Sequence, residues 1–371
     1  DPDETDYYYQ YKTLYNSGIN NKDEAGIYFA SYGNPNLKWE TQISSDIAVD
    51  FSLFDRLTGT IEYFRKDSKS LLFEVPTAYS IGVSSIKANI GKVSNSGLEI
   101  DLNYQLVRSA DFNLLIGGNA TFLHNEIKRL PDDLREQGIV SGTKKYMEGR
   151  SVYEFWLRQY KGVNPDNGDP VYLFDETNAW NEKTCYEKNG VKYTSNVNLA
   201  KYDYSGSAVP KMQGGFNLAA SYKHFDFAAI FSYKLGSDIY NTAYSGLMSS
   251  AFGDAWHPDM LKAWRKTGDV TDIPRLDSSN TTSNDASSST RWLMSGDYLS
   301  LRSVSLAYSI PRTTLNVLKV GLQSCRISVS GENLFQLNHM QGLDAQATFN
   351  GMIYNSYYPS RTFTMGINIT F

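Results

Sequence analysis

Apolar and polar side chains alternate along much of this chain. In Thr41 to Leu53 the apolar residues Ile43, Ile47 and Val49 share one parity, and mostly polar residues occupy the other. Because successive side chains of a β-strand point to opposite faces, this spacing predicts a strand with one apolar and one polar face. The other segments of this kind are Leu57 to Leu72, Ser96 to Leu106, Phe112 to Phe122, Val152 to Val163, Val171 to Phe174, Met212 to Tyr222, Phe225 to Leu235, Tyr298 to Ser309, Arg326 to Leu334 and Tyr357 to Phe371.

The predicted strands are long. Most of the about eleven segments run for ten residues or more, whereas strands of globular domains average about five or six and tilted membrane strands need about nine to eleven. Short turns alternate with long polar loops, which fall at roughly 73–94, 126–150, 175–209, 236–296 and 335–356. Transmembrane β-barrels show this asymmetry, with short periplasmic turns and long extracellular loops.

The pattern therefore predicts an all-β fold, an antiparallel transmembrane β-barrel. Residues 1–38 are expected to form an extracellular loop region, and residues 39–371 the barrel strands and their loops. Bacterial single-chain barrels close with an even number of strands, and an open edge in lipid leaves unpaired backbone groups at several kcal/mol each. The odd count of about eleven thus predicts partner strands from an upstream segment, covalently continuous or cleaved.

The last predicted strand, Tyr357 to Phe371, ends in an aromatic residue and is apolar at every outward position. Its outward residues resemble the signal that the outer-membrane assembly machinery recognises. We expect this role for Phe363, Met365, Ile367, Ile369 and Phe371. The tyrosines near strand ends that are predicted to anchor the barrel at lipid headgroups are Tyr63, Tyr104, Tyr222 and Tyr308.

Composition excludes other classes of protein. The 371 residues are 41% hydrophobic, the mean hydropathy is -0.42, and no run of about 18 apolar residues occurs, which excludes a helical membrane protein. The 27 Tyr, 18 Phe and 6 Trp are favoured in strands and at membrane interfaces. A net charge of -5 without a basic cluster offers no surface for nucleic acid.

The sequence carries no catalytic or metal-binding set, and we expect no cofactor. Asp46 and Asp50 lie on one strand face about 13 Å apart, too far for a carboxylate pair. Glu99 and Asp101, about 6.6 Å apart, have a separation that suits glycosidic chemistry but lie in a polar strip of the predicted lumen. The histidines lack the spacing of a metal site, and they are His124, His224, His257 and His339.

Short sequence phrases in a fixed order carry a family resemblance. Asn34 to Glu40 reads NPNLKWE, which is similar to a loop-to-strand phrase of TonB-dependent receptors. Asn89 to Glu99 reads NIGKVSNSGLE, and Gly162 to Tyr172 reads GVNPDNGDPVY. These two resemble the NxGxVxNxGxE and GV(D/N)PxxGDPxY signatures of the SusC/RagA family of TonB-dependent outer-membrane transporters from the Bacteroidetes. Further phrases follow in family order at 210–211, 214–216, 225–226, 298–302 and 330–335.

The resemblance implies a barrel of about 22 strands filled by an N-terminal plug, with a SusD-like surface lipoprotein that closes over it as a lid. This chain is then expected to be the C-terminal half of that barrel. The plug, the segment that contacts the TonB complex and the remaining half of the barrel lie outside it. The implied location is integral to the outer membrane of a Gram-negative, Bacteroidetes-type bacterium, in contact with its lipid.

Aromatic loop residues are the remaining site candidates. The tyrosines of the first loop could stack on sugar rings or hold peptide side chains, because flat rings supply contact area at little entropic cost. The alternative is contact with the lid lipoprotein or with neighbouring loops. These residues are Tyr7, Tyr8, Tyr9, Tyr11 and Tyr15. In the longest loop, structural packing is expected for Trp256, Trp264, Trp292, Arg265 and Arg275.

The function implied by the resemblance is import of oligosaccharides or oligopeptides, energised through TonB and gated by the SusD-like lid. No enzymatic activity is expected. The alternative is a SusC-like barrel that acts as a structural or assembly scaffold in an outer-membrane complex, since the plug and the coupling segment lie outside the chain. A passive porin requires an open lumen and fits the loop signatures poorly.

Overall fold

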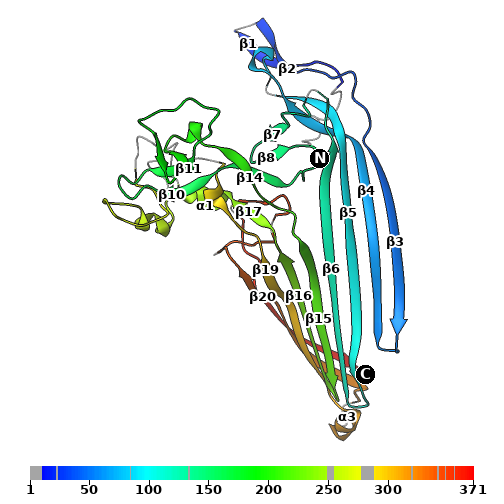
Figure 1. Ribbon diagram of the computed structural model, residues 1–371. Coiled ribbons are helices and arrows are strands. Elements are labelled where there is room, and N and C mark those ends of the chain that lie inside the picture. The colour runs from blue at the N-terminus through cyan, green and yellow to red at the C-terminus, as the bar shows by residue number, and fades with distance from the viewer. Residues whose placement is uncertain are drawn as a thin grey trace.

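One antiparallel sheet of nine strands dominates the structure, a computed structural model that describes residues 11–21, 24–83, 85–132, 134–248, 255–276, 288–318, 321–340, 342–346, 348–354 and 356–371. The strand order is β22-β20-β19-β16-β15-β6-β5-β4-β3. Strands that succeed one another along the chain are therefore neighbours, once the loop elements between them are left out. Figure 1 shows the sheet as a curved wall, with α3 at its lower end and the loop elements gathered at its upper end.

We call this sheet the wall. Its strands are β3 (Thr41–Leu53), β4 (Leu57–Pro76), β5 (Ser85–Arg108), β6 (Phe112–Arg129), β15 (Met212–Tyr222), β16 (Phe225–Leu235), β19 (Tyr298–Ser309), β20 (Ser324–Asn338) and β22 (Thr362–Thr370). The strands β3, β15, β16 and β19 have the bounds that the alternation predicts. The transmembrane β-barrel architecture predicted from the sequence is thus confirmed for the wall.

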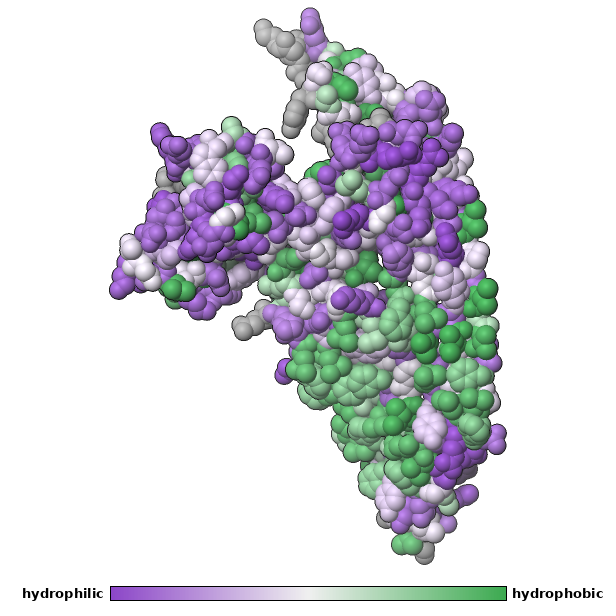
Figure 2. Space-filling model, in the orientation of Figure 1, coloured by the Kyte–Doolittle hydropathy of each residue, from purple (hydrophilic) through white to green (hydrophobic). Residues whose placement is uncertain are grey.

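The outward face of the wall carries a belt of exposed apolar side chains. Ile47 is 73% exposed, Phe363 72% and Met365 69%, although all three lie in regular strands. Figure 2 shows this hydrophobic region over the lower part of the wall, with hydrophilic surface above it and again near the lower tip. An apolar surface of this extent, bounded by polar surface at both ends, is typical of a lipid-facing barrel wall.

Aromatic residues mark the turn end of the belt. At the turn end, Tyr222 packs edge-on against Phe112 at 6.4 Å between ring centroids, and Phe225 lies 4.6 Å from Tyr308. The two tyrosine rings are amphipathic and fit the interface between lipid and water. Tyr63 is six residues beyond the start of β4, so it lies further toward the loop side than the other three tyrosines.

The two longest wall strands extend beyond the predicted ends. The ladder between β4 and β5 continues from Leu71 opposite Ile90 to Pro76 opposite Ser85. The predicted loop at 73–94 is therefore mostly strand, and this prediction was wrong. Above the apolar belt both strand faces meet water, so the alternation disappears although the backbone hydrogen bonding goes on.

Two predicted barrel strands belong to the loops instead. The segment Val152 to Val163 divides into β9 (Glu154–Arg158) and β10 (Tyr160–Val163), and Val171 to Phe174 corresponds to β11 (Pro170–Leu173). They lie in two small four-stranded sheets, ordered β14-β9-β8-β7 and β10-β11-β13-β12. The described wall consequently has nine strands rather than about eleven.

Short elements make up the rest of the fold. On the loop side they are β1 (Leu14–Asn21), β2 (Glu24–Ser31), η2 (Tyr79–Ile81), β7 (Ile139–Ser141), β8 (Lys144–Tyr146), β12 (Cys185–Lys188), β13 (Val191–Thr194), η3 (Val197–Leu199), β14 (Tyr202–Ser207), β17 (Asp238–Asn241), α1 (Thr242–Leu247), η4 (Pro258–Lys262), η5 (Thr290–Trp292), β18 (Leu293–Ser295) and β21 (Met352–Ile353). At the turn end, α3 (Arg312–Leu318) connects β19 to β20. None of the helices within the described residues is long and apolar enough to cross a membrane.

Candidate functional site

The loops between the wall strands fold together over one end of the wall, and we call this end the mouth. Phe155 and Leu157 of β9 are fully buried there, together with Tyr240, Met248 and Trp292. These residues come from two loops, the one between β6 and β15 and the one between β16 and β19, so the mouth has a packed core of its own. The predicted packing role of Trp292 is consistent with its 1% exposure.

A turn at the outer part of the mouth is fixed by contacts from the longest loop. The indole nitrogen of Trp264 donates a hydrogen bond to the carbonyl oxygen of Pro165 at 3.0 Å, and Arg275 forms an ion pair with Asp169 at 2.9 Å. Gly168 between them has a φ of +78°, and a Cβ there would lie 2.3 Å from the Trp264 ring. Trp264 and Arg275 therefore pack structurally, as the sequence predicts.

The buried lysine Lys144 is the most perturbed cation of the mouth. It is 8% exposed, its ammonium nitrogen donates to the carbonyl oxygen of Tyr153 at 2.9 Å, and no carboxylate partner is recorded for it among the described residues. Burial lowers its pKa to about 7. Burial likewise raises the pKa of Tyr160 to about 12, so this hydroxyl stays protonated and donates to the carbonyl oxygen of Asp272 at 2.9 Å.

The inward face of the wall is polar. Thr60 donates to Asp50 at 2.6 Å, and the Asn103 amide donates to Asp101 at 2.8 Å. These carboxylates thus have hydrogen-bond partners on the wall, and the structure gives no reason to assign them a catalytic role.

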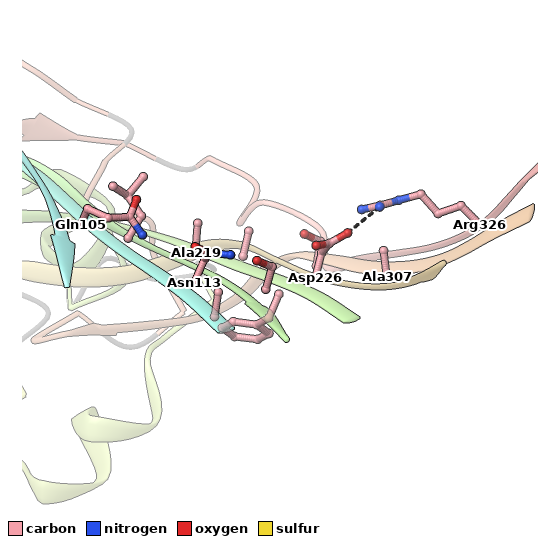
Figure 3. Close-up of a pocket in the computed structure, with 12 residues that line it drawn as sticks. Gln105, Asn113, Ala219, Asp226, Ala307 and Arg326 are labelled. Atoms are coloured by element: carbon pink, nitrogen blue, oxygen red, sulfur yellow. Dashed lines mark hydrogen bonds and ion pairs between the residues drawn. The ribbon is translucent and has the colours of Figure 1, made fainter. Parts of the chain in front are cut away.

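A recess of about 330 Å³ lies on the wall near its turn end, between the polar side chains of several strands. In Figure 3, Asp226 of β16 and Arg326 of β20 point toward each other and form an ion pair. The small residues Ala219 and Ala307 line the same recess. Small side chains beside a paired charge leave room for a segment or solute close to the wall.

The tyrosine cluster predicted in the first loop lies partly outside the described residues, because Tyr7, Tyr8 and Tyr9 fall there. Tyr15 belongs to β1, is 60% exposed and contacts Phe29 of β2 edge-on at 5.9 Å between ring centroids. Tyr11 lies just before this hairpin and is 50% exposed. Ligand or lid contact by these rings stays a prediction.

The C-terminal strand β22 lies at one edge of the wall and pairs with β20. The side chains predicted as an assembly signal are all exposed. Those on the outward face of β22 are Phe363, Met365, Ile367 and Ile369, and Phe371 directly follows the strand. Their use by the assembly machinery stays a prediction. Among the described residues, no group of three His, Cys, Asp or Glu side chains could hold a metal ion.

Comparisons with known proteins agree with this architecture. Residues 2–247 match the family model described as TonB dependent receptor-like, beta-barrel. TonB-dependent receptor P3 of Formosa agariphila is 30% identical over 93% of this chain and 36% of its own length. TonB-dependent receptor SusC of Bacteroides thetaiotaomicron is 26% identical over 91% of this chain and 32% of its own length.

Solved structures with a similar fold include the RagAB peptide transporter. Its matching chain superimposes with a TM-score of 0.80 at 22% identity, over 98% of this chain and 39% of that one. The RagAB peptide importer in its closed-closed state gives a TM-score of 0.79 over the same shares. This chain thus spans about a third of the length of the relatives that it matches. The wall, its lipid-facing belt and these matches establish that the chain belongs to the TonB-dependent receptor-like β-barrel family, with SusC among its relatives.

Proposed function

We propose that the chain forms part of a SusC-type importer that takes up oligosaccharides or oligopeptides across the outer membrane. The observation that carries this proposal is the combination of a lipid-facing belt with a polar inward face beneath a folded mouth. A wall of this kind separates lipid from a polar path, and the packed loops of the mouth offer a surface on which a solute can be selected. SusC and the other curated relatives are TonB-dependent receptors, which supports energy-dependent uptake.

The proposal also includes further barrel strands, a lipoprotein and the TonB complex. The wall has edges at β3 and β22, and an edge in lipid leaves backbone groups without hydrogen bonds. Additional strands of the same barrel are therefore proposed to pair with these edges. A SusD-like lipoprotein is proposed to cover the mouth, and a region preceding this chain to contact the TonB complex. The proposed site of action is the outer membrane of a Bacteroidetes-type bacterium.

A gene deletion tests the proposal. Cells that lack the gene are given defined pools of oligopeptides and oligosaccharides, and depletion of each pool from the medium is followed by mass spectrometry. We expect loss of uptake for one pool and its restoration by the intact gene. Unchanged uptake of every pool, together with altered composition of an envelope complex, would instead support the scaffold role.

A further inference from the structure

The segment between β20 and β22 folds inward and is fixed to the wall. Ala345 is fully buried, and its carbonyl oxygen accepts a hydrogen bond from the Lys234 ammonium at 3.2 Å. Arg302 of β19 donates to the side-chain oxygen of Gln346 at 2.9 Å. Further along, the amide of Tyr240 donates to the carbonyl oxygen of Gly351 at 2.7 Å. These contacts hold the middle of the segment in place, at Ala345, Gln346 and Gly351.

One large apolar side chain of this fixed segment is nevertheless exposed. Phe349 is 83% exposed and faces the Tyr153 ring edge-on, with 6.5 Å between ring centroids. Gly351 has a φ of +80°, and a Cβ there would lie 2.8 Å from the Phe155 ring. The backbone beside Phe349 is therefore pressed against the core of the mouth, so the position of this ring is set by packing at its neighbours.

Phe349 and Tyr153 form the rim of a recess of about 400 Å³ at the inner side of the mouth. The apolar part of its lining is formed by Leu123, Val209 and Pro210, and Gln213 of β15 lines the same recess. Lys234, which is 8% exposed, supplies the only cationic side chain among the described residues that line the recess. Its ammonium nitrogen lies 5.5 Å from the centre of the Tyr298 ring.

The recess combines apolar side chains with one cation. Of the lining side chains that the structure describes, none is a carboxylate, although Asp297 and Asp344 lie close enough to act on Lys234 from beside the recess. The side-chain oxygen of Gln346 already accepts hydrogen bonds from Arg302 and Ser232. An uncharged sugar ring offers no opposite charge to the Lys234 ammonium. An apolar group beside a carboxylate matches the lining better.

We propose that this recess binds the C-terminal residue of an oligopeptide, a specification that rests on the proposed import function. The apolar side chain of that residue packs against Phe349 and Tyr153, and its carboxylate pairs with the Lys234 ammonium. A charged hydrogen bond in a partly desolvated site is stronger than a neutral one. The recess thereby distinguishes a free peptide carboxylate from an amide.

The test uses the intact transporter complex purified from its own membrane. An N-terminally labelled peptide of alanines ending in leucine is titrated as the free acid and as the C-terminal amide, and trigalacturonate is titrated as a competitor. We expect the free acid to bind more tightly than the amide. Phe349→Ala should weaken both peptides about tenfold, since it removes one of the two rings against which the C-terminal side chain packs. Lys234→Gln, which keeps a donor for Ala345 but removes the charge, should abolish the preference for the free acid.

Matched substitutions elsewhere in the loops serve as controls. Val270→Ala removes a 96% exposed apolar side chain and Lys201→Gln a half-exposed cation, and neither should change binding. Wild-type affinity in Phe349→Ala and Lys234→Gln would overturn the proposed site while leaving peptide import intact. Tighter binding of trigalacturonate, weakened by the same substitutions, would overturn the peptide assignment. Lower thermal stability without any change in selectivity would assign these side chains to packing against another part of the protein.

Discussion

The ammonium nitrogen of Lys144 lies 3.3 Å from the centre of the Phe155 ring, and both side chains are buried in the mouth. The negative face of the ring stabilises the cation, but burial still lowers the pKa of Lys144 to about 7. At this buried position the neutral amine of Lys144 is therefore lower in free energy, relative to the ammonium, than it would be in water.

This relationship predicts a pH dependence of stability in the mouth. Between about 7 and the ordinary value of 10.5, the unfolded chain binds the proton that the folded chain has lost. Stability should then rise with pH across this window, by at most about 1.4 kcal/mol per pH unit. Below the window both forms are protonated and the cost of the buried charge is fully present.

Urea unfolding in detergent at pH 7 to 10, followed by near-ultraviolet circular dichroism of the aromatic mouth, measures the predicted slope. Lys144→Met should remove the slope, because the methionine fills similar space without a charge. Lys145→Met removes the neighbouring, half-buried lysine, provides the comparison and should keep the slope. An unchanged slope in Lys144→Met would show that other groups titrate in this range.

The wall could be predicted from sequence because each strand that faces lipid on one side needs apolar residues at every second position. Phe225 to Leu235 alternates with the period of a strand that faces lipid on one side, and β16 has these same bounds. The segment around Phe155 and Leu157 alternates too, but its apolar face meets the core of the mouth. Alternation indicates that one face of a strand is apolar. It does not indicate whether lipid or other parts of the protein cover that face, and β9 was therefore wrongly assigned to the barrel.

The recess at the mouth could not be predicted in the same way. Ala345 is buried in a cluster with Ile239 and Ile353, and its carbonyl oxygen accepts a hydrogen bond from Lys234, which is 111 residues away in the chain. Nothing in the local sequence around Phe349 indicates that the segment folds inward. The exposed ring is recognisable as unusual only when the long-range hydrogen bonds that fix its neighbours are known.

The contact of Gly168 with Trp264 predicts a second measurable effect. Gly168→Ala introduces a Cβ within 2.3 Å of the indole ring in addition to a left-handed backbone, so the ring must move and its hydrogen bond to Pro165 is weakened. Gly142 also has a positive φ, of +57°, but nothing lies within 4 Å of a Cβ there. Gly142→Ala should therefore cost only the backbone term of about 1 kcal/mol.

Limited trypsin digestion of the folded protein compares the two variants, since Lys262, Arg265 and Lys266 lie in the segment that carries Trp264. Cleavage at these residues should become several times faster in Gly168→Ala and stay near the wild-type rate in Gly142→Ala. Equal rates in both variants would mean that the left-handed backbone, rather than the contact with Trp264, determines how well the turn is held.

Because one face of β22 is directed toward lipid, the loss of stability caused by a new charge should depend on which face of the strand carries it. Ile367→Lys places an ammonium group on the lipid-facing side and should destabilise the barrel by about 2 to 4 kcal/mol if the residue lies near the bilayer midplane. Thr364→Lys lies in the same strand with the opposite parity and should be nearly neutral. The fraction of folded, heat-modifiable barrel in isolated outer membranes measures both. A larger loss for Thr364→Lys would reverse the assignment of the two faces.

The ion pair between Asp226 and Arg326 is predicted to contribute little to the stability of the barrel, although the paired atoms lie only 2.5 Å apart. Both side chains are 43% exposed, so water screens their attraction and the pair should contribute no more than about 1 kcal/mol to stability. A double-mutant cycle with Asp226→Asn and Arg326→Gln, measured by urea unfolding, gives this coupling directly. A coupling well above that value would mean that the recess around the pair is dry in the complete barrel. In that case another segment of the protein must cover this part of the wall and exclude water from it.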